Sequence, residues 1–156
     1  MRGAGYIAEV MTGPTGSGKT LAALLFLVSG PVGEKKVIIT RATTKNQWKR
    51  EASQYTDLKL RVLSGTTPYE LSPGDEAVVL SWEILKGWYP ELVRWAGNHP
   101  MSVIWDEIHK GKSHRRKEKY VRTNGTIGWR LMENRAAYAS RLSKLASRSL
   151  GLTATT

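Results

Sequence analysis

One glycine-rich segment constrains the fold of this chain more than any other feature. Residues 13–20 read Gly-Pro-Thr-Gly-Ser-Gly-Lys-Thr, so two glycines are separated by four residues and followed by Lys19 and Thr20. The mostly apolar residues 6–11 predict a strand before it, and residues 19–29 predict a helix after it. Glycines let the backbone turn until several N–H groups point at an anion, and the positive end of the helix faces the same point. The sequence therefore predicts a phosphate-binding loop between a strand and a helix.

Each residue type in this loop has its own chemical task. Backbone N–H groups would hold phosphate oxygens, Lys19 would reach the β- and γ-phosphates, and the Thr20 hydroxyl would hold a magnesium ion. The competing interpretation is a glycine turn with an exposed lysine, but a random chain of this length would contain the whole pattern well under about 1% of the time. The predicted nucleotide-binding residues are Gly13, Thr15, Gly16, Ser17, Gly18, Lys19 and Thr20.

An apolar run that ends in two carboxylates is the second informative segment. Residues 101–105 predict a buried strand, and Asp106 and Glu107 follow at its end, where open parallel sheets bind ligands. Asp106 would bind Mg²⁺, and Glu107 would orient and deprotonate an attacking water. A strand can end in Asp-Glu by chance, but after a phosphate loop the pair indicates hydrolysis. We therefore predict ATP and Mg²⁺ as cofactors, with Glu107 and Lys19 as catalytic residues.

Strand-like and helix-like segments alternate along the whole chain. This alternation is typical of a parallel sheet covered by helices, and 156 residues suffice for one core, so we predict a single α/β domain over residues 1–156. Thr44 and Gln47 have the spacing of a capping box that opens a helix. Further strands are predicted over 37–40, 60–63, 77–80 and just before Gly151, and helices over 44–55, after Ser81, from Pro90 to Gly97, and over 130–147 with Leu131, Tyr138, Leu142 and Leu145 near one face.

The charge balance points to a polyanionic partner. Lys and Arg number 24 against 13 Asp and Glu, which gives a net charge of +11, and clustered cations bind phosphates by releasing counterions. The chain has no cysteine, which excludes a disulfide scaffold and fits an intracellular compartment, cytoplasmic or nuclear. The apolar run 21–28 is far shorter than the roughly 20 residues that cross a bilayer, so we expect no membrane partner.

Several segments together resemble the first motor domain of superfamily 2 helicases and translocases. Asp-Glu-Ile-His at 106–109 looks like the family's second motif, Leu-Thr-Ala-Thr at 152–155 like its third, and Asn-Gln-Trp-Lys-Arg-Glu at 46–51 like the stretch after the second strand. Three segments look most like the Swi/Snf-type translocases: the one at 46–51, Val-Val-Leu-Ser-Trp-Glu-Ile-Leu at 78–85, and Lys-Gly-Lys-Ser at 110–113. The phosphate loop is more like that of DEAD-box and DEAH-type proteins.

The resemblance implies a RecA-like domain with a twisted, mostly parallel sheet and helices on both faces. It implies that His109, Thr153 and Thr155 couple the nucleotide site to nucleic acid, and that Arg41 holds the nucleic-acid backbone. It also implies a second RecA-like domain, in cis or in trans, which would supply an arginine finger. The isolated chain is therefore expected to turn over ATP poorly.

Residues 110–122 carry seven basic residues and one acid. They predict either a solvated face or a surface for phosphates or for the second domain, and the nucleic-acid candidates there are Lys110, Lys112, Arg115 and Arg116. The six tryptophans are predicted mainly as core because the chain has only one phenylalanine.

These features favour a nucleic-acid-dependent ATPase, a helicase or a duplex translocase, acting on DNA in preference to RNA. The alternative is a nucleic-acid-binding module that is regulated by bound nucleotide and does not itself hydrolyse ATP. A packaging-type motor would share both nucleotide motifs but does not predict the segments at 46–51 and 152–155.

Overall fold

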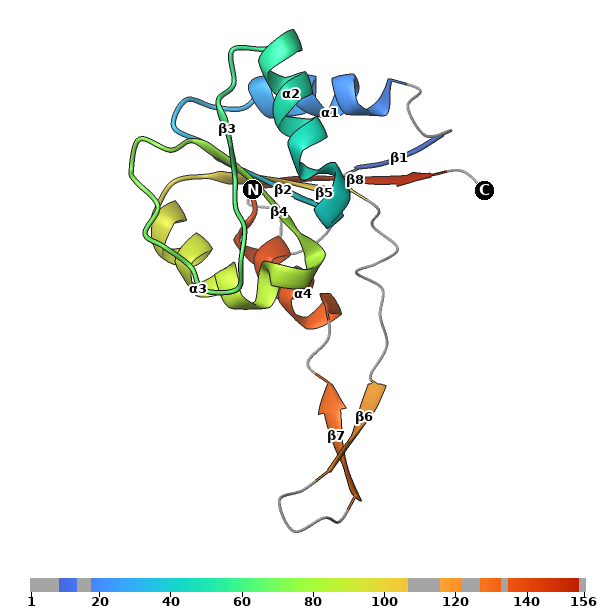
Figure 1. Cartoon of the computed structure of the whole chain (residues 1–156). Coiled ribbons are helices and arrows are strands. Elements are labelled where there is room, and N and C mark those ends of the chain that lie inside the picture. The colour runs from blue at the N-terminus through green and yellow to red at the C-terminus, as the bar shows by residue number, and fades with distance from the viewer. Residues whose placement is uncertain (1–8, 14–17, 107–115, 122–126, 133–134, 155–156) are drawn as a thin grey trace.

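The computed structural model describes residues 9–13, 18–106, 116–121, 127–132 and 135–154, and side chains over 18–106 and 137–152 (Figure 1). Of the predicted first strand, residues 6–8 lie outside this range. No described helix is long and apolar enough to cross a membrane.

Six parallel strands form the central sheet, in the order β1-β8-β5-β2-β4-β3. Every residue of β2 and β4 and the first five of β5 are buried, as expected for parallel strands covered on both faces. The strands are β1 (Glu9–Gly13), β2 (Lys35–Thr40), β3 (Leu60–Val62), β4 (Ala77–Ser81), β5 (Met101–Asp106) and β8 (Arg148–Ala154).

Helices cover both faces of this sheet (Figure 1). On one face α1 (Lys19–Val28) and α2 (Lys45–Tyr55) enclose an apolar cluster that includes Leu24, Leu27 and Ile38. On the other face α3 (Leu85–Ala96) and α4 (Arg135–Leu145) enclose a second cluster. The prediction of an α/β domain with helices on both faces is confirmed.

Most tryptophans belong to these clusters, as predicted. Five have side chains that the structure describes, and each is at most 5% exposed: Trp48, Trp82, Trp88, Trp95 and Trp105. They supply the aromatic volume that a chain with a single phenylalanine lacks. Trp129 lies on β7 (Ile127–Met132), and its side chain is outside the described range.

The predicted break at Pro90 is wrong, because α3 runs through this residue. Proline cannot donate to the carbonyl one turn earlier, which weakens the helix locally. Trp88 and Leu92 on either side of it are fully buried, and Trp95 nearly so. Burial of this apolar face keeps the helix continuous despite the lost hydrogen bond. A short 3₁₀ turn, Trp82–Ile84, leads into the helix.

The helix predicted from Thr44 is confirmed, but its capping box is wrong. A 3₁₀ turn, Ala42–Thr44, precedes α2 and gives Thr44 a φ of −109° and a ψ of 2°, unlike the extended backbone of a capping residue. The Thr44 hydroxyl makes no cap hydrogen bond and lies 2.6 Å from the Thr40 hydroxyl. Gln47 donates to Glu51 instead, at 2.9 Å.

The helix predicted over 130–147 begins only at Arg135, and an antiparallel hairpin precedes it. β6 (Arg116–Val121) pairs with β7 from Arg116↔Met132 to Val121↔Ile127 and forms a separate two-stranded sheet. Residues 127, 129 and 131 are apolar and alternate, which is a strand pattern, so Leu131 belongs to this ladder rather than to α4.

The remaining boundaries differ by a few residues. β1 reaches Gly13 rather than residue 11, and β2 begins two residues earlier than predicted, at Lys35. β8 continues through Thr153 to Ala154 rather than ending before Gly151, because it pairs with both β1 and β5. Strand pairing, which local sequence does not encode, sets these ends.

Candidate functional site

The carboxyl ends of four neighbouring strands meet at one edge of the sheet. Because β1, β8, β5 and β2 are adjacent and parallel, Gly13, Ala154, Asp106 and Thr40 end their strands at the same side. The register sets Gly13 opposite Ala154 and Asp106 opposite Leu152. Ligands of open parallel sheets bind beyond such ends. This edge, named the carboxyl edge below, is therefore the candidate site.

The glycine-rich segment joins β1 to α1 at the carboxyl edge. Gly13 ends β1, residues 14–17 lie outside the described range, and Gly18 precedes the helix. Gly18 has a φ of +88°, a left-handed conformation that favours glycine. Nothing lies within 4 Å of a Cβ added there, so the backbone conformation rather than space selects the residue. Thr15, Gly16 and Ser17 lie outside the described range, so their roles stay predictions.

Lys19 and Thr20 form the first turn of α1. Both are partly buried, and no acidic residue stands in this turn. The first N–H groups of a helix lack intrahelical partners and carry positive partial charge. An anion at the end of β1 would thus meet the helix terminus, the Lys19 ammonium and the Thr20 hydroxyl together.

Asp106 ends β5 with its carboxylate held from two other elements. Its Oδ2 accepts hydrogen bonds from the Thr40 hydroxyl at 2.6 Å and from the Trp48 indole N–H at 3.1 Å. The backbone carbonyl of Asp106 accepts from the Trp82 indole N–H at 2.9 Å. Within the described part of the chain, no donor is bonded to Oδ1. The described donors therefore anchor the carboxylate through Oδ2.

The Thr40 hydroxyl extends this contact to the turn between β2 and α2. Its single proton goes to the Asp106 carboxylate, which can only accept, so the 2.6 Å contact with Thr44 is one in which Thr44 donates. The Thr44 hydroxyl also lies 3.1 Å from the carbonyl of Arg41. Arg41, the predicted nucleic-acid contact, is exposed on this turn.

The structure brings only part of the predicted site together. Gly13, Gly18, Lys19, Thr20, Asp106 and the backbone of Thr153 lie at the carboxyl edge or directly beside it. Arg116 lies in β6, in the separate hairpin. Outside the described residues are Thr15, Gly16, Ser17, Glu107, His109, Lys110, Lys112, Arg115 and Thr155.

Sequence reasoning missed Thr40 and Trp48 as partners of Asp106. Trp48 was predicted as core, and it is buried, but its N–H also reaches the carboxylate. Thr44 was predicted as a cap. No local signal links either residue to Asp106, because Thr40 and Trp48 lie 66 and 58 residues before it in the chain.

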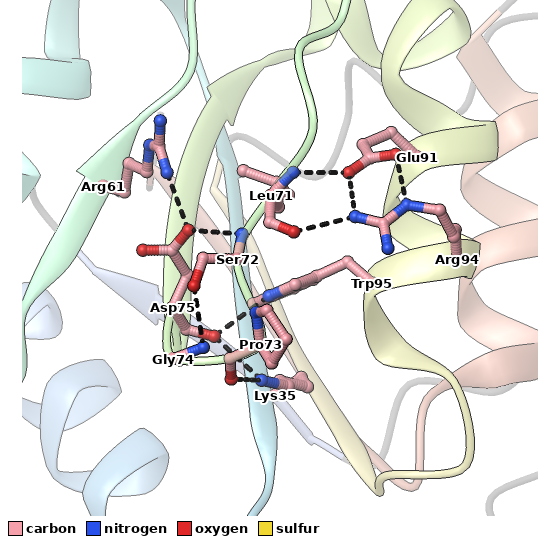
Figure 2. A network of polar contacts seen from close by, with 10 residues as sticks. All are labelled: Lys35, Arg61, Leu71, Ser72, Pro73, Gly74, Asp75, Glu91, Arg94 and Trp95. Atoms are coloured by element: carbon pink, nitrogen blue, oxygen red, sulfur yellow. Dashed lines mark hydrogen bonds and ion pairs between the residues drawn. The ribbon is translucent and has the colours of Figure 1, made fainter.

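The clear pKa shifts belong to a different network, around the loop before β4 (Figure 2). The backbone N–H of Ser72 is the main cause that lowers the pKa of Asp75, and Arg61 adds to it. Burial lowers the pKa of Lys35, whose ammonium donates to the carbonyls of Pro73 and Asp75. These contacts fasten the loop to β2 and β3.

Part of the same network ties the loop to α3. The hydrogen bond from Arg94 lowers the pKa of Glu91, and the Glu91 carboxylate accepts from the backbone N–H of Leu71. Arg94 donates to the carbonyl of Leu71 at 2.8 Å (Figure 2). The network is structural and lies apart from the carboxyl edge.

No protein-family model matches this chain, and no curated protein matches it. Among solved structures, it is similar to two of arterivirus nonstructural protein 10, a helicase, one of them in complex with DNA. Each match has 14% sequence identity and a TM-score of 0.50 and covers 97% of this chain. This chain spans 30% and 29% of those proteins. The similarity shows a helicase-like α/β fold; membership of superfamily 2 and of the Swi/Snf type stays a prediction.

Proposed function

We propose that this chain is the ATP-binding motor domain of a nucleic-acid-dependent ATPase, a helicase or a duplex translocase. One observation carries the proposal. The glycine segment that opens α1 and the carboxylate that ends β5 stand at the same edge of a parallel sheet, with β8 between their strands. This is the arrangement in which one residue set binds phosphate and another binds its metal.

The residues at this edge suit the chemistry of magnesium nucleotide. Mg²⁺ prefers oxygen ligands and is commonly held by one or two protein groups together with substrate phosphates. The Thr20 hydroxyl and the Asp106 carboxylate are such oxygen ligands, and Lys19 would bind the β- and γ-phosphates. When bound, Mg²⁺ neutralises charge on the phosphate oxygens. Glu107, the residue after Asp106, would accept the proton of the attacking water.

Nucleic acid is the proposed partner, with DNA preferred to RNA. The net charge of +11 supports a polyanion, and one of the similar helicase structures contains DNA. Arg41 on the β2–α2 turn would contact the backbone, helped by Lys110, Lys112, Arg115 and Arg116. His109, Thr153 and Thr155 would couple the two sites.

A second RecA-like domain is part of the proposal. This chain spans less than a third of the helicases that it resembles in structure, and the predicted arginine finger would come from the second domain. A complete catalytic site would then form between the two domains.

Calorimetric titration with ADP in the presence of Mg²⁺ tests the nucleotide site. Lys19→Ala should weaken binding at least tenfold, because this ammonium makes a charge-assisted contact with phosphate. Lys59→Ala is a charge-matched control, since Lys59 is exposed beside β3 and away from the carboxyl edge. Equal affinity in the wild type and Lys19→Ala would remove this site.

A further inference from the structure

We infer that Thr40 and Trp48 are positioning residues that orient the Asp106 carboxylate for its cation. The inference rests on the proposed function, since it concerns the magnesium ligand of that site. Both side chains donate to the same carboxylate oxygen, Oδ2, at 2.6 and 3.1 Å. Oδ1 has no donor among the described residues, so this oxygen would be the one offered to the metal or to its water shell.

The two donors approach from different elements, which restrains the carboxylate better than one bond would. Asp106 is on β5, Thr40 ends β2, and Trp48 lies in the first half of α2. Thr40 is fully buried and Trp48 is 4% exposed, so water does not readily compete for either bond. Two bonds to one oxygen limit rotation of the carboxylate about its own axis.

Comparison with three other buried tryptophans indicates that the bond from Trp48 does more than give a buried N–H an acceptor. The indoles of Trp82, Trp88 and Trp95 each donate to a backbone carbonyl. Trp48 instead donates to an ionisable side chain. A backbone acceptor serves packing equally well, whereas a carboxylate acceptor ties the indole to the one acidic side chain that ends β5.

The same contacts reach the predicted nucleic-acid turn. Thr44 donates to Thr40, and both Thr44 and Arg41 belong to the turn between β2 and α2. A shift of this turn would act first on the hydroxyl that holds Asp106. The hydrogen-bonded series Thr44, Thr40, Asp106 thus gives nucleic acid at Arg41 a short physical route to the metal ligand.

The test compares ADP affinity in Mg²⁺ with ADP affinity in EDTA for each variant of the full chain. Thr40→Val removes one donor at nearly constant size, and Trp48→Phe removes the other and leaves a smaller aromatic ring; loss of such outer contacts typically costs 10- to 100-fold in metal affinity. We expect the Mg²⁺-dependent gain to fall at least tenfold in both, with the affinity in EDTA changed less than twofold. Thr40→Ser keeps the hydroxyl and should retain most of the gain.

Trp95→Phe is the matched control. It also removes a buried indole donor, but its acceptor is the carbonyl of Asp75. Its Mg²⁺-dependent gain should equal that of the wild type. If Trp95→Phe loses as much as Trp48→Phe, the effect is one of general packing and the positioning role is wrong.

A spectroscopic measurement on the unsubstituted side chain covers the case in which the variants fold poorly. The chain is labelled with 5-fluorotryptophan, and the ¹⁹F resonance of Trp48 is assigned by its loss in Trp48→Phe. Addition of Mg²⁺ to the ADP-bound chain should shift this resonance, and Asp106→Asn should abolish the shift. An unmoved Trp48 resonance would overturn the inference.

The outcomes separate this inference from the proposed function. A wild-type chain with no Mg²⁺-dependent gain in ADP affinity would overturn both. A normal gain that survives in Trp48→Phe and Thr40→Val would leave the nucleotide site in place and overturn only the positioning role.

Discussion

Each end of the sheet has a carboxylate, and the two carboxylates differ in their hydrogen-bond and ion-pair partners. At the amino end, Glu34 is 1% exposed and accepts from Arg148 through both oxygens, at 2.9 Å each, and from Ser102 at 3.0 Å. At the carboxyl edge, Asp106 is partly buried, and its described donors are a hydroxyl and an indole. Glu34 has cations as partners, Arg148 and more distantly Lys36, whereas Asp106 has only neutral donors among the described residues.

This difference separates a structural carboxylate from one suited to a cation. A bidentate guanidinium pairs with the charge of Glu34, and Arg148 and Ser102 together occupy both of its oxygens inside the protein. Neutral donors fix Asp106 without cancelling its charge, which leaves attraction for a metal. The packing around Gly30 is consistent with this, because a Cβ added there would collide with Glu34 Oε1. The amino end is closed by packing.

The largest expected effect concerns the arginine finger that we propose a second domain supplies to the carboxyl edge. An arginine finger contributes on the order of 10³ to 10⁵ in rate, or roughly 4 to 7 kcal/mol, and we expect it from the second domain. The isolated chain should bind ATP without multiple turnover, and the second domain should restore hydrolysis. A steady-state phosphate-release assay measures this, with Glu107→Gln as the inactive control. Nucleic-acid-stimulated turnover by this chain alone above about 1 per second, abolished in Glu107→Gln, would contradict it.

Removal of the Glu34–Arg148 ion pair should lower the free energy of unfolding and leave nucleotide affinity unchanged. Arg148→Met leaves the buried Glu34 carboxylate with only Ser102 and the more distant Lys36 ammonium, at 3.9 Å, so the loss should approach the roughly 3 to 5 kcal/mol typical of a broken buried pair. Arg61→Met is the matched control, because its ion pair with Asp75 is 40% exposed on the arginine side and should cost about 0 to 1 kcal/mol. Urea unfolding measures both. Similar losses in the two variants would show that burial does not distinguish the pairs.

The sequence predicted the phosphate loop and Asp106 at the carboxyl edge, but not the side chains that hold Asp106 in place. The loop at 13–20 and Asp106 were recognisable because their chemistry is local: glycines next to a helix start, and a carboxylate at a strand end. The bonds from Thr40 and Trp48 span 66 and 58 residues. They depend on β2 lying beside β5, and this order comes from tertiary packing.

The hairpin was missed although its signals are local. Residues 127, 129 and 131 alternate as apolar, and Asn124-Gly125 is a common hairpin dipeptide. The spacing of Leu131 and Tyr138 also fits a helix face, and short apolar runs fit either period. Pairing with β6 decides between them.

A fourfold rise in salt concentration should weaken nucleic-acid binding about a hundredfold and leave the amino end of the sheet nearly unaffected. If the chain contacts about four phosphates, the slope of log affinity against log salt should be near −3 to −4. Unfolding free energy from the Glu34–Arg148 pair should change little over the same range, because buried pairs are poorly screened. Replacing Arg115 and Arg116 together with alanine should flatten the slope measured by fluorescence anisotropy. An unchanged slope would assign the basic run to a solvated face.

The smallest expected effect comes from replacing each carboxylate with its isosteric amide, which also gives the most direct comparison of the two ends. In Asp106→Asn the side-chain carbonyl can still accept from Thr40 and Trp48, so unfolding free energy should change by less than about 1 kcal/mol. In Glu34→Gln the new amide turns donors toward Arg148 and removes the charge that this guanidinium pairs with, which should cost about 1.5 to 3 kcal/mol. The Mg²⁺-dependent gain in ADP affinity should show the reverse order, lost in Asp106→Asn and kept in Glu34→Gln. Urea unfolding and calorimetry on the same two proteins measure both quantities. If Asp106→Asn destabilises the chain as much as Glu34→Gln does, the Asp106 carboxylate is a structural anchor like its counterpart, and neutral donors do not mark a metal ligand.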